Sequence, residues 1–173
     1  ELTVKYGVIL VFDETITGFR FSEGGAQELF GVIPDLATFG KGIANGFPLS
    51  AIVGKREIMM EMEEIFFSAT FGGELLSLAA AKVVLELHRR RQIVPKLIEI
   101  GKALDNGLRE IVENYKFQGT LTLSGHPTWV FLTWHDTNNY ESSIIRTFFM
   151  QEIFKRGILV LGTHNVNTAI KSK

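Results

Sequence analysis

The sequence contains no cysteine, which excludes a disulfide framework, a thiolate nucleophile and a zinc site with thiolate ligands. It has no apolar run of the length that spans a bilayer and no basic-then-apolar pattern at its start. It also lacks a basic surplus, because 18 Lys and Arg face 19 Asp and Glu. These absences predict a cytoplasmic protein without nucleic-acid or membrane partners.

The 173 residues are 46% hydrophobic and 21% charged, a composition typical of a globular protein that buries a core. The four histidines are scattered, with no pair four residues apart, so we expect no metal site. The chain starts with Glu, and residues 1–7 have the pattern of the last turns of a helix that ends at Gly7. We therefore expect a fragment of a longer protein.

Residues 1–90 have the pattern of an α/β domain. The apolar run 8–12 predicts a strand buried on both faces, which is typical of a parallel sheet covered by helices. Residues 36–39 and 49–53 predict two further short strands. Apolar residues at helical spacing and a basic last turn predict a helix over 74–91.

Residues 91–173 have a different character, and we place a domain boundary near residue 90. Their patterns of alternation and helical spacing predict a small two-layer α+β unit. The expected helices cover 93–114 and 142–156, and the expected strands cover 120–124, 129–134 and 158–161.

Two places in the first ninety residues carry candidate chemistry. Asp13 and Glu14 follow the first strand at its carboxyl end, where ligands collect in open α/β sheets, although a capping pair is an equal alternative. Lys41 lies between Gly40 and Gly42, where a flexible backbone can approach a ligand and the lysine amine can form an imine. A solvated surface lysine is the alternative there.

Residues 68–73 come directly before the expected helix over 74–91. Free N–H groups and the Thr70 hydroxyl at a helix N-terminus can bind phosphate, and a plain Ser/Thr-capped entry is the alternative. A nucleotide-binding P-loop is excluded at Lys41, because Asp35 stands where the motif needs glycine and Gly42 where it needs Ser or Thr.

Several short motifs occur in a definite order, at residues 12–20 (FDETITGFR), 24–27 (GGAQ), 30–31 (FG), 34–42 (PDLATFGKG), 45–51 (NGFPLSA) and 69–73 (ATFGG). Each one alone is weak. Together they resemble the class III aminotransferases, pyridoxal-phosphate enzymes of fold type I, and most closely their glutamate-1-semialdehyde 2,1-aminomutase subgroup. Ile16, where many ω-amino-acid transaminases have Gln, favours this subgroup.

The resemblance implies a fold and a domain assignment. Residues 1–90 would be the C-terminal part of the pyridoxal-phosphate-binding large domain, a mostly parallel sheet with helices. Residues 91–173 would be an incomplete C-terminal small α+β domain. The family's upstream phosphate loop and ring-stacking aromatic residue are not in this sequence, so the resemblance implies little or no activity for this chain alone.

The resemblance also implies roles for four residues. Lys41 would hold pyridoxal 5′-phosphate as a Schiff base and, once released, act as the general base. Asp13 would face the pyridine nitrogen and keep the ring protonated. Thr15 stands where the family usually has a branched apolar residue against the ring and still offers a methyl group. Thr70 would reach the phosphate of a cofactor held mainly by the other subunit of a homodimer.

The substrate class that follows is a small-molecule amino donor or acceptor. Two alternatives remain open. One is a transaminase acting on a nucleotide-linked sugar or an ω-amine. The other is a non-catalytic interaction module that kept the same fold.

Overall fold

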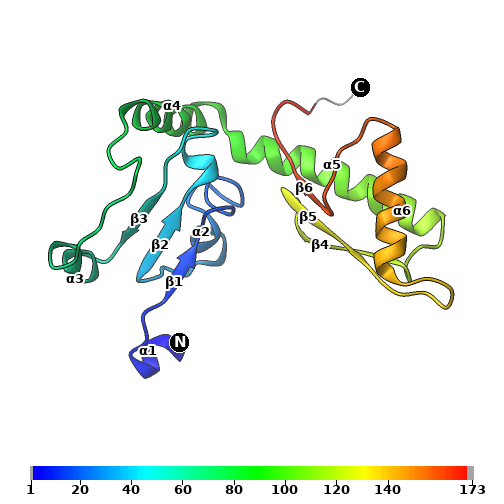
Figure 1. Cartoon of the computed structure of the whole chain (residues 1–173), viewed down its shortest axis with the longest axis horizontal. Helices are drawn as coiled ribbons and strands as arrows, with labels where there is room; N and C mark the ends of the chain where they lie inside the picture. The colour runs from blue at the N-terminus through cyan, green and yellow to red at the C-terminus, as the bar shows by residue number, and fades with distance from the viewer. Residues whose placement is uncertain (1, 171–173) are drawn as a thin grey trace. The chain divides into compact units, whose positions relative to one another are not determined.

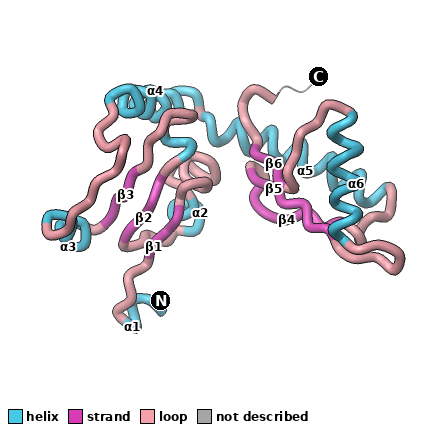
Figure 2. Tube along the Cα trace, in the orientation of Figure 1, coloured by secondary structure: helices cyan, strands magenta, loops and turns pink. Residues whose placement is uncertain are grey.

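The computed structural model describes residues 2–170, and the chain divides into two compact units, Glu1–Val94 and Pro95–Lys173 (Figures 1 and 2). Each unit has its own small sheet and its own helices. The elements of the first are α1 (Leu2–Tyr6), β1 (Val11–Asp13), α2 (Ala26–Phe30), β2 (Leu36–Phe39), the 3-10 turn η1 (Lys41–Ile43), β3 (Ala51–Gly54), α3 (Arg56–Met59), the 3-10 turn η2 (Met60–Glu63) and α4 (Leu75–Arg91). The second begins within the first turn of α5 (Ile93–Asn114) and contains β4 (Leu121–His126), β5 (Trp129–Trp134), α6 (Ser142–Lys155) and β6 (Thr163–Asn165).

The sheet of the first unit has the strand order β1-β2-β3. β1 runs parallel to β2, with Asp13 opposite Thr38, whereas β3 runs antiparallel to β2. The described sheet is therefore mixed and not mostly parallel. Because β1 and β2 are parallel, their carboxyl ends lie at the same edge, which places the segments after Asp13 and Phe39 next to each other.

Asp35 stabilises the other end of these strands, where β2 begins and β3 ends. Its carboxylate accepts a hydrogen bond from the N–H of Leu10 at 2.7 Å and pairs with Lys55 Nζ at 2.6 Å. The Leu10 hydrogen bond, followed by the bond and charge of Lys55, holds the pKa of Asp35 below its usual range. One side chain thus ties the approach to β1, the start of β2 and the end of β3 together.

The expectation of a strand over 8–12, buried on both faces, is wrong in both extent and burial. β1 covers Val11–Asp13, and Val8, Ile9 and Val11 are more than half exposed. These exposures show that the described residues do not cover both faces of β1, which is also an edge strand that pairs only with β2 in the described sheet. The third strand is also displaced, since it covers Ala51–Gly54 and not 49–53.

The expected helices over 74–91, 93–114 and 142–156 are confirmed to within a residue at their ends as α4, α5 and α6. Pro95 lies in the first turn of α5, where its missing N–H costs no helical hydrogen bond. The helical turn before Gly7 is confirmed as α1, and Gly7 takes the left-handed φ of 64°. No helix among residues 2–170 is long and apolar enough to cross a membrane.

The second unit is built on an antiparallel sheet with the order β4-β5-β6. Its core is a cluster of Leu121, Leu123, Val130 and Leu132 from β4 and β5. Leu108 and Val112 of α5 and Phe149 of α6 pack against this cluster. Both helices therefore cover the face of the sheet that carries these four side chains, which gives two layers.

The expected strand over 158–161 is wrong. That segment is a loop, and β6 covers Thr163–Asn165. Val160 packs against the core cluster, but Leu159 and Leu161 are about three-quarters exposed, at 75% and 74%. Pairing with β5 begins only where Gly162, with a φ of 94°, turns the chain and its carbonyl accepts the N–H of Leu132 at 3.0 Å.

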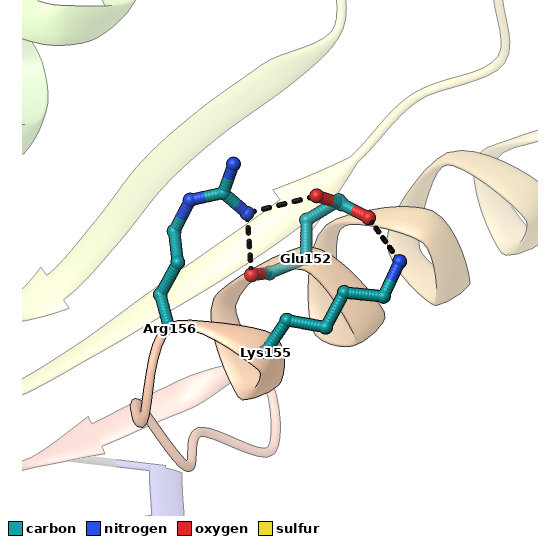
Figure 3. A network of polar contacts seen from close by, with 3 residues as sticks. All are labelled: Glu152, Lys155 and Arg156. Carbon is teal, nitrogen blue, oxygen red and sulfur yellow. Dashed lines mark hydrogen bonds and ion pairs between the residues drawn. The ribbon is translucent and has the colours of Figure 1, made fainter.

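Charged side chains close the carboxyl end of α6 (Figure 3). Arg156 Nη1 donates to the Glu152 carbonyl at 2.7 Å and to its carboxylate at 2.8 Å, and Lys155 Nζ pairs with the other carboxylate oxygen at 2.8 Å. The Arg156 bond, followed by that of Lys155, lowers the pKa of Glu152. These exposed pairs stabilise the fold only weakly, but they satisfy a carbonyl in the last turn of the helix.

Two glycines of α5 offer a matched test of the packing in the second unit. A Cβ at Gly101 would collide with the Pro127 carbonyl of the β4–β5 turn, whereas a Cβ at Gly107 would meet nothing within 4 Å. We expect Gly107→Ala to stabilise the unit by about 1 kcal/mol through helix propensity. We expect Gly101→Ala to destabilise it by about 1–3 kcal/mol through overpacking. Urea unfolding followed by circular dichroism measures both, and equal effects would contradict the packing.

Candidate active site

Asp13, the last residue of β1, presents an exposed carboxylate at the carboxyl edge of the first sheet. Its Oδ1 accepts the N–H of Thr15 at 3.0 Å and the hydroxyl of Thr38 at 3.2 Å. Hydrogen bonds from the Thr15 side chain and backbone, then from Thr38, hold the pKa of Asp13 below its usual range, and the Lys41 charge adds a smaller contribution in the same direction. Asp13 therefore remains a carboxylate at neutral pH.

Glu14, the neighbour of Asp13, has the opposite environment. Its side chain is only 1% exposed, and its two oxygens accept the N–H groups of Ala26 and Gln27, each at 2.8 Å. The acidic pair is thus divided, because Glu14 caps the start of α2 from within the fold while Asp13 faces outward. The capping interpretation is confirmed for Glu14, and the ligand-binding role of Asp13 stays a prediction.

Lys41 is the first residue of η1, and Gly40 separates it from the end of β2. Its side chain is exposed, and Nζ has no hydrogen bond or ion pair with any described residue. The backbone of Lys41 has the left-handed φ of 40°, which is uncommon for a residue with a side chain. The sequence predicts a flexible backbone at the glycines that flank Lys41. Gly40, however, has an extended φ of −163°, which any residue can adopt.

Thr15 lies between these two groups and is half-buried. Its methyl Cγ2 lies 3.2 Å from the point that a Cβ at Gly40 would occupy. The absence of a side chain at Gly40 therefore makes room for Thr15 between Asp13 and the segment that carries Lys41. The structure brings three of the four predicted residues, Asp13, Thr15 and Lys41, to one edge of the sheet.

Thr70 lies in an exposed turn before α4, and no hydrogen bond or ion pair links it to the other three within residues 2–170. The N-terminus of α4 is occupied by the chain's own carboxylate. Glu74 accepts the N–H groups of Leu76 at 2.8 Å and Ser77 at 2.7 Å, and the Ser77 hydroxyl at 2.5 Å. The hydroxyl and N–H of Ser77 and the N–H of Leu76 lower the pKa of Glu74, so it stays charged. These N–H groups are not free to bind an anion, and the expected anion site does not form on them.

Thr38 also contributes to the environment of Asp13, although no sequence motif points to this role. Its hydroxyl reaches Asp13 only because the parallel register sets the two residues opposite each other. A threonine in a short strand has no signal of its own, since many strands contain one. No group of three or more His, Cys, Asp or Glu side chains in the described part of the chain could hold a metal ion.

Comparison with known sequences shows the family. The family described as Aminotransferase class-III matches residues 1–171. The chain belongs to the class III aminotransferase family. The glutamate-1-semialdehyde 2,1-aminomutase of Persephonella marina is 37% identical over 146 residues, which are 83% of this chain and 34% of that relative. The enzyme of the same name from Aquifex aeolicus is 33% identical over 92% of this chain and 40% of its own length. The chain thus spans between a third and two-fifths of the length of these class III relatives.

Solved structures agree with the family. The FumI protein of Sphingopyxis sp. MTA144, described in its PLP internal aldimine form, matches with a TM-score of 0.83 and 26% identity over 96% of this chain and 39% of its own. An omega-transaminase from Sphaerobacter thermophilus matches with a TM-score of 0.84 over 98% of this chain and 42% of its own. Its 24% identity supports the fold alone. The described class III chain is thus α/β with small sheets, as in these transaminases.

The Thr38 hydroxyl gives a direct test of the Asp13 environment. We expect Thr38→Val to raise the pKa of Asp13 toward its usual range, because valine keeps the strand shape and removes one donor. Since the folded-state pKa of Asp13 is lowered, its contribution to stability is present above the unfolded-state pKa and is lost as pH falls through the folded-state value. Thr38→Val should weaken that acid dependence.

Carboxyl carbon NMR titration of the full chain measures this pKa. Thr122→Val is the matched control, because its hydroxyl contacts His135 Nε2 at 2.7 Å in the second unit. An Asp13 pKa that moves equally in both variants, or in neither, would contradict the described contact.

Proposed function

We propose that this chain provides the lysine and the aspartate of a pyridoxal-phosphate-dependent amino-group transfer site, in a transaminase or a glutamate-1-semialdehyde-type aminomutase. The observation that carries the proposal is the convergence of Asp13, Thr15 and Lys41 at the carboxyl ends of two parallel strands, in a chain of the class III family. The relatives named as aminomutases favour the aminomutase reaction. The transaminase of a nucleotide-linked sugar or an ω-amine and the non-catalytic module have no specific observation in their favour, because the omega-transaminase likeness supports the fold alone.

The residues present fit the reactive end of this cofactor. The Lys41 amine is exposed and forms no ion pair with a described residue, so an aldehyde can reach it. Asp13 keeps its negative charge, as the partner of a protonated pyridine nitrogen must. The N-terminus of α4 does not fit the phosphate, because the Glu74 carboxylate already occupies it. Within this proposal, Thr70 binds phosphate through its hydroxyl and its own turn.

Pyridoxal phosphate, when bound, supplies an aldehyde carbon for the amine and a ring that accepts an electron pair. In the proposed mechanism the Asp13 carboxylate would pair with a protonated ring nitrogen, and Thr15 would offer its methyl group to the ring. Lys41 Nζ would hold the cofactor covalently. The same amine would serve as the general base toward the substrate α-carbon, because it is anchored at the same sheet edge as Asp13.

The remaining parts of the assignment concern domains, assembly and location. We assign residues 1–90 to the C-terminal part of the cofactor-binding large domain and residues 91–173 to the small α+β domain. We propose a homodimer with the site at its interface, located in the cytoplasm. The exposed Phe66, Phe67 and Phe71 around Thr70 support the dimer, since apolar side chains that are 96%, 61% and 55% exposed are typical of a surface that another chain covers.

Labelling of lysine tests the proposed function without requiring turnover. The full chain is mixed with pyridoxal 5′-phosphate and reduced with borohydride, and the pyridoxyl lysine is located by peptide mass. We expect the label at Lys41 in preference to the other lysines, together with a visible imine absorbance band that Lys41→Ala abolishes. The matched control is Lys82→Ala, an exposed lysine of α4, which should retain both. Label distributed over the lysines without enrichment at Lys41 would overturn the proposal.

A further inference from the structure

Glu14 is a buried charged group that the proposed mechanism does not use. It is among the most deeply buried side chains of the described chain, at 1% exposure. Burying a carboxylate is costly unless strong donors surround it. We therefore expect groups in the loop after β1 to compensate for the burial of this carboxylate beside Asp13.

The donors around Glu14 come from separate parts of that loop. Oε2 accepts the Ala26 N–H at 2.8 Å and the Thr17 hydroxyl, and Oε1 accepts the Gln27 N–H at 2.8 Å. A side chain at Gly25 would place its Cβ 2.5 Å from Oε2, so only glycine allows the backbone this close. The Glu14 carboxylate thus joins the turn at Thr17 to the first residues of α2.

The backbone of Glu14 makes a second set of contacts. Its N–H donates to the Thr38 carbonyl at 2.8 Å, and its carbonyl accepts the Gly18 N–H at 2.9 Å. Thr38 is the same residue whose hydroxyl holds Asp13 Oδ1. Glu14 therefore lies between two donors to Asp13, Thr15 in its own turn and Thr38 on the neighbouring strand.

We propose that Glu14 is a positioning residue, which holds the turn after β1 so that Thr15 and Thr38 fix the Asp13 carboxylate beside Lys41. This inference rests on the proposed function for its catalytic meaning, but its physical content is a property of the chain without cofactor. Loss of the Glu14 carboxylate would release the turn at Thr17 and with it the Thr15 N–H and hydroxyl.

The sign of one measurement separates positioning from a simple effect of charge. If Glu14 acted on Asp13 only as a nearby negative charge, its neutralisation would lower the pKa of Asp13 further. If Glu14 positions the donors, its neutralisation raises the pKa of Asp13, because hydrogen bonds to the carboxylate are lost. The two mechanisms therefore predict opposite shifts.

The test is an NMR carboxyl titration of Asp13 in the full chain without cofactor. We expect Glu14→Gln to raise the Asp13 pKa, because a Gln side chain has one acceptor oxygen for three donors. The control is Asp35→Asn, which removes the ion pair with Lys55 and leaves one acceptor oxygen at the opposite end of the same strands. It should cost stability and leave the Asp13 pKa low.

Thr17→Val is the second variant, because it removes one donor and keeps both the Glu14 charge and its backbone contacts. We expect a smaller rise in the same direction, and this variant decides the question if Glu14→Gln does not fold. A fall in the Asp13 pKa, no change, or an equal rise in Asp35→Asn would overturn the inference. The titration uses the chain without cofactor, so its result does not depend on whether Lys41 binds pyridoxal phosphate. Failure of this inference can therefore be distinguished from failure of the proposed function, which lysine labelling tests.

Discussion

The parallel pairing of β1 with β2 is the constraint on which the rest of the site depends. It places Asp13 opposite Thr38 and brings the turn after each strand to the same edge. A shift of one residue would turn every side chain of the shifted strand to the other face of the sheet, and Asp13 would lose the Thr38 hydroxyl. Such short strands have few ladder hydrogen bonds to resist that shift, so their register needs support from side chains.

That support comes from buried or half-buried carboxylates at both ends of the strands. Asp35 ties the amino end of the pair through Leu10 and Lys55. At the carboxyl end, the Glu14 carboxylate holds the turn after β1 against the start of α2, and the Glu14 N–H donates to the Thr38 carbonyl of β2. Each of these carboxylates has its oxygens occupied by donors. Asp13 keeps an exposed carboxylate. The sheet thus separates the acidic groups that fix the backbone from the one to which the proposed function assigns chemistry.

The three long helices could be predicted from the sequence, because their apolar periodicity depends on residues close together along the chain. The ordered motifs of the first ninety residues likewise indicated the family, because each motif is a continuous stretch of sequence. The burial of residues 8–12 could not, since it depends on whether another layer covers an edge strand. The prediction of a strand over 158–161 was wrong for a related reason, because in that segment only Val160 packs against the core cluster. The contact between Thr38 and Asp13 could not be predicted, because it depends on the register of β1 against β2. The local sequence of two such short strands does not determine that register.

The start of α4 shows how one residue changes what a helix end can bind. A helix N-terminus attracts anions through its free N–H groups and its dipole. Glu74 satisfies both with its own charge, so an incoming phosphate would face a carboxylate where the helix alone would offer donors. Within the proposed function, a phosphate bound near Thr70 therefore needs cations or donors from beyond this helix end.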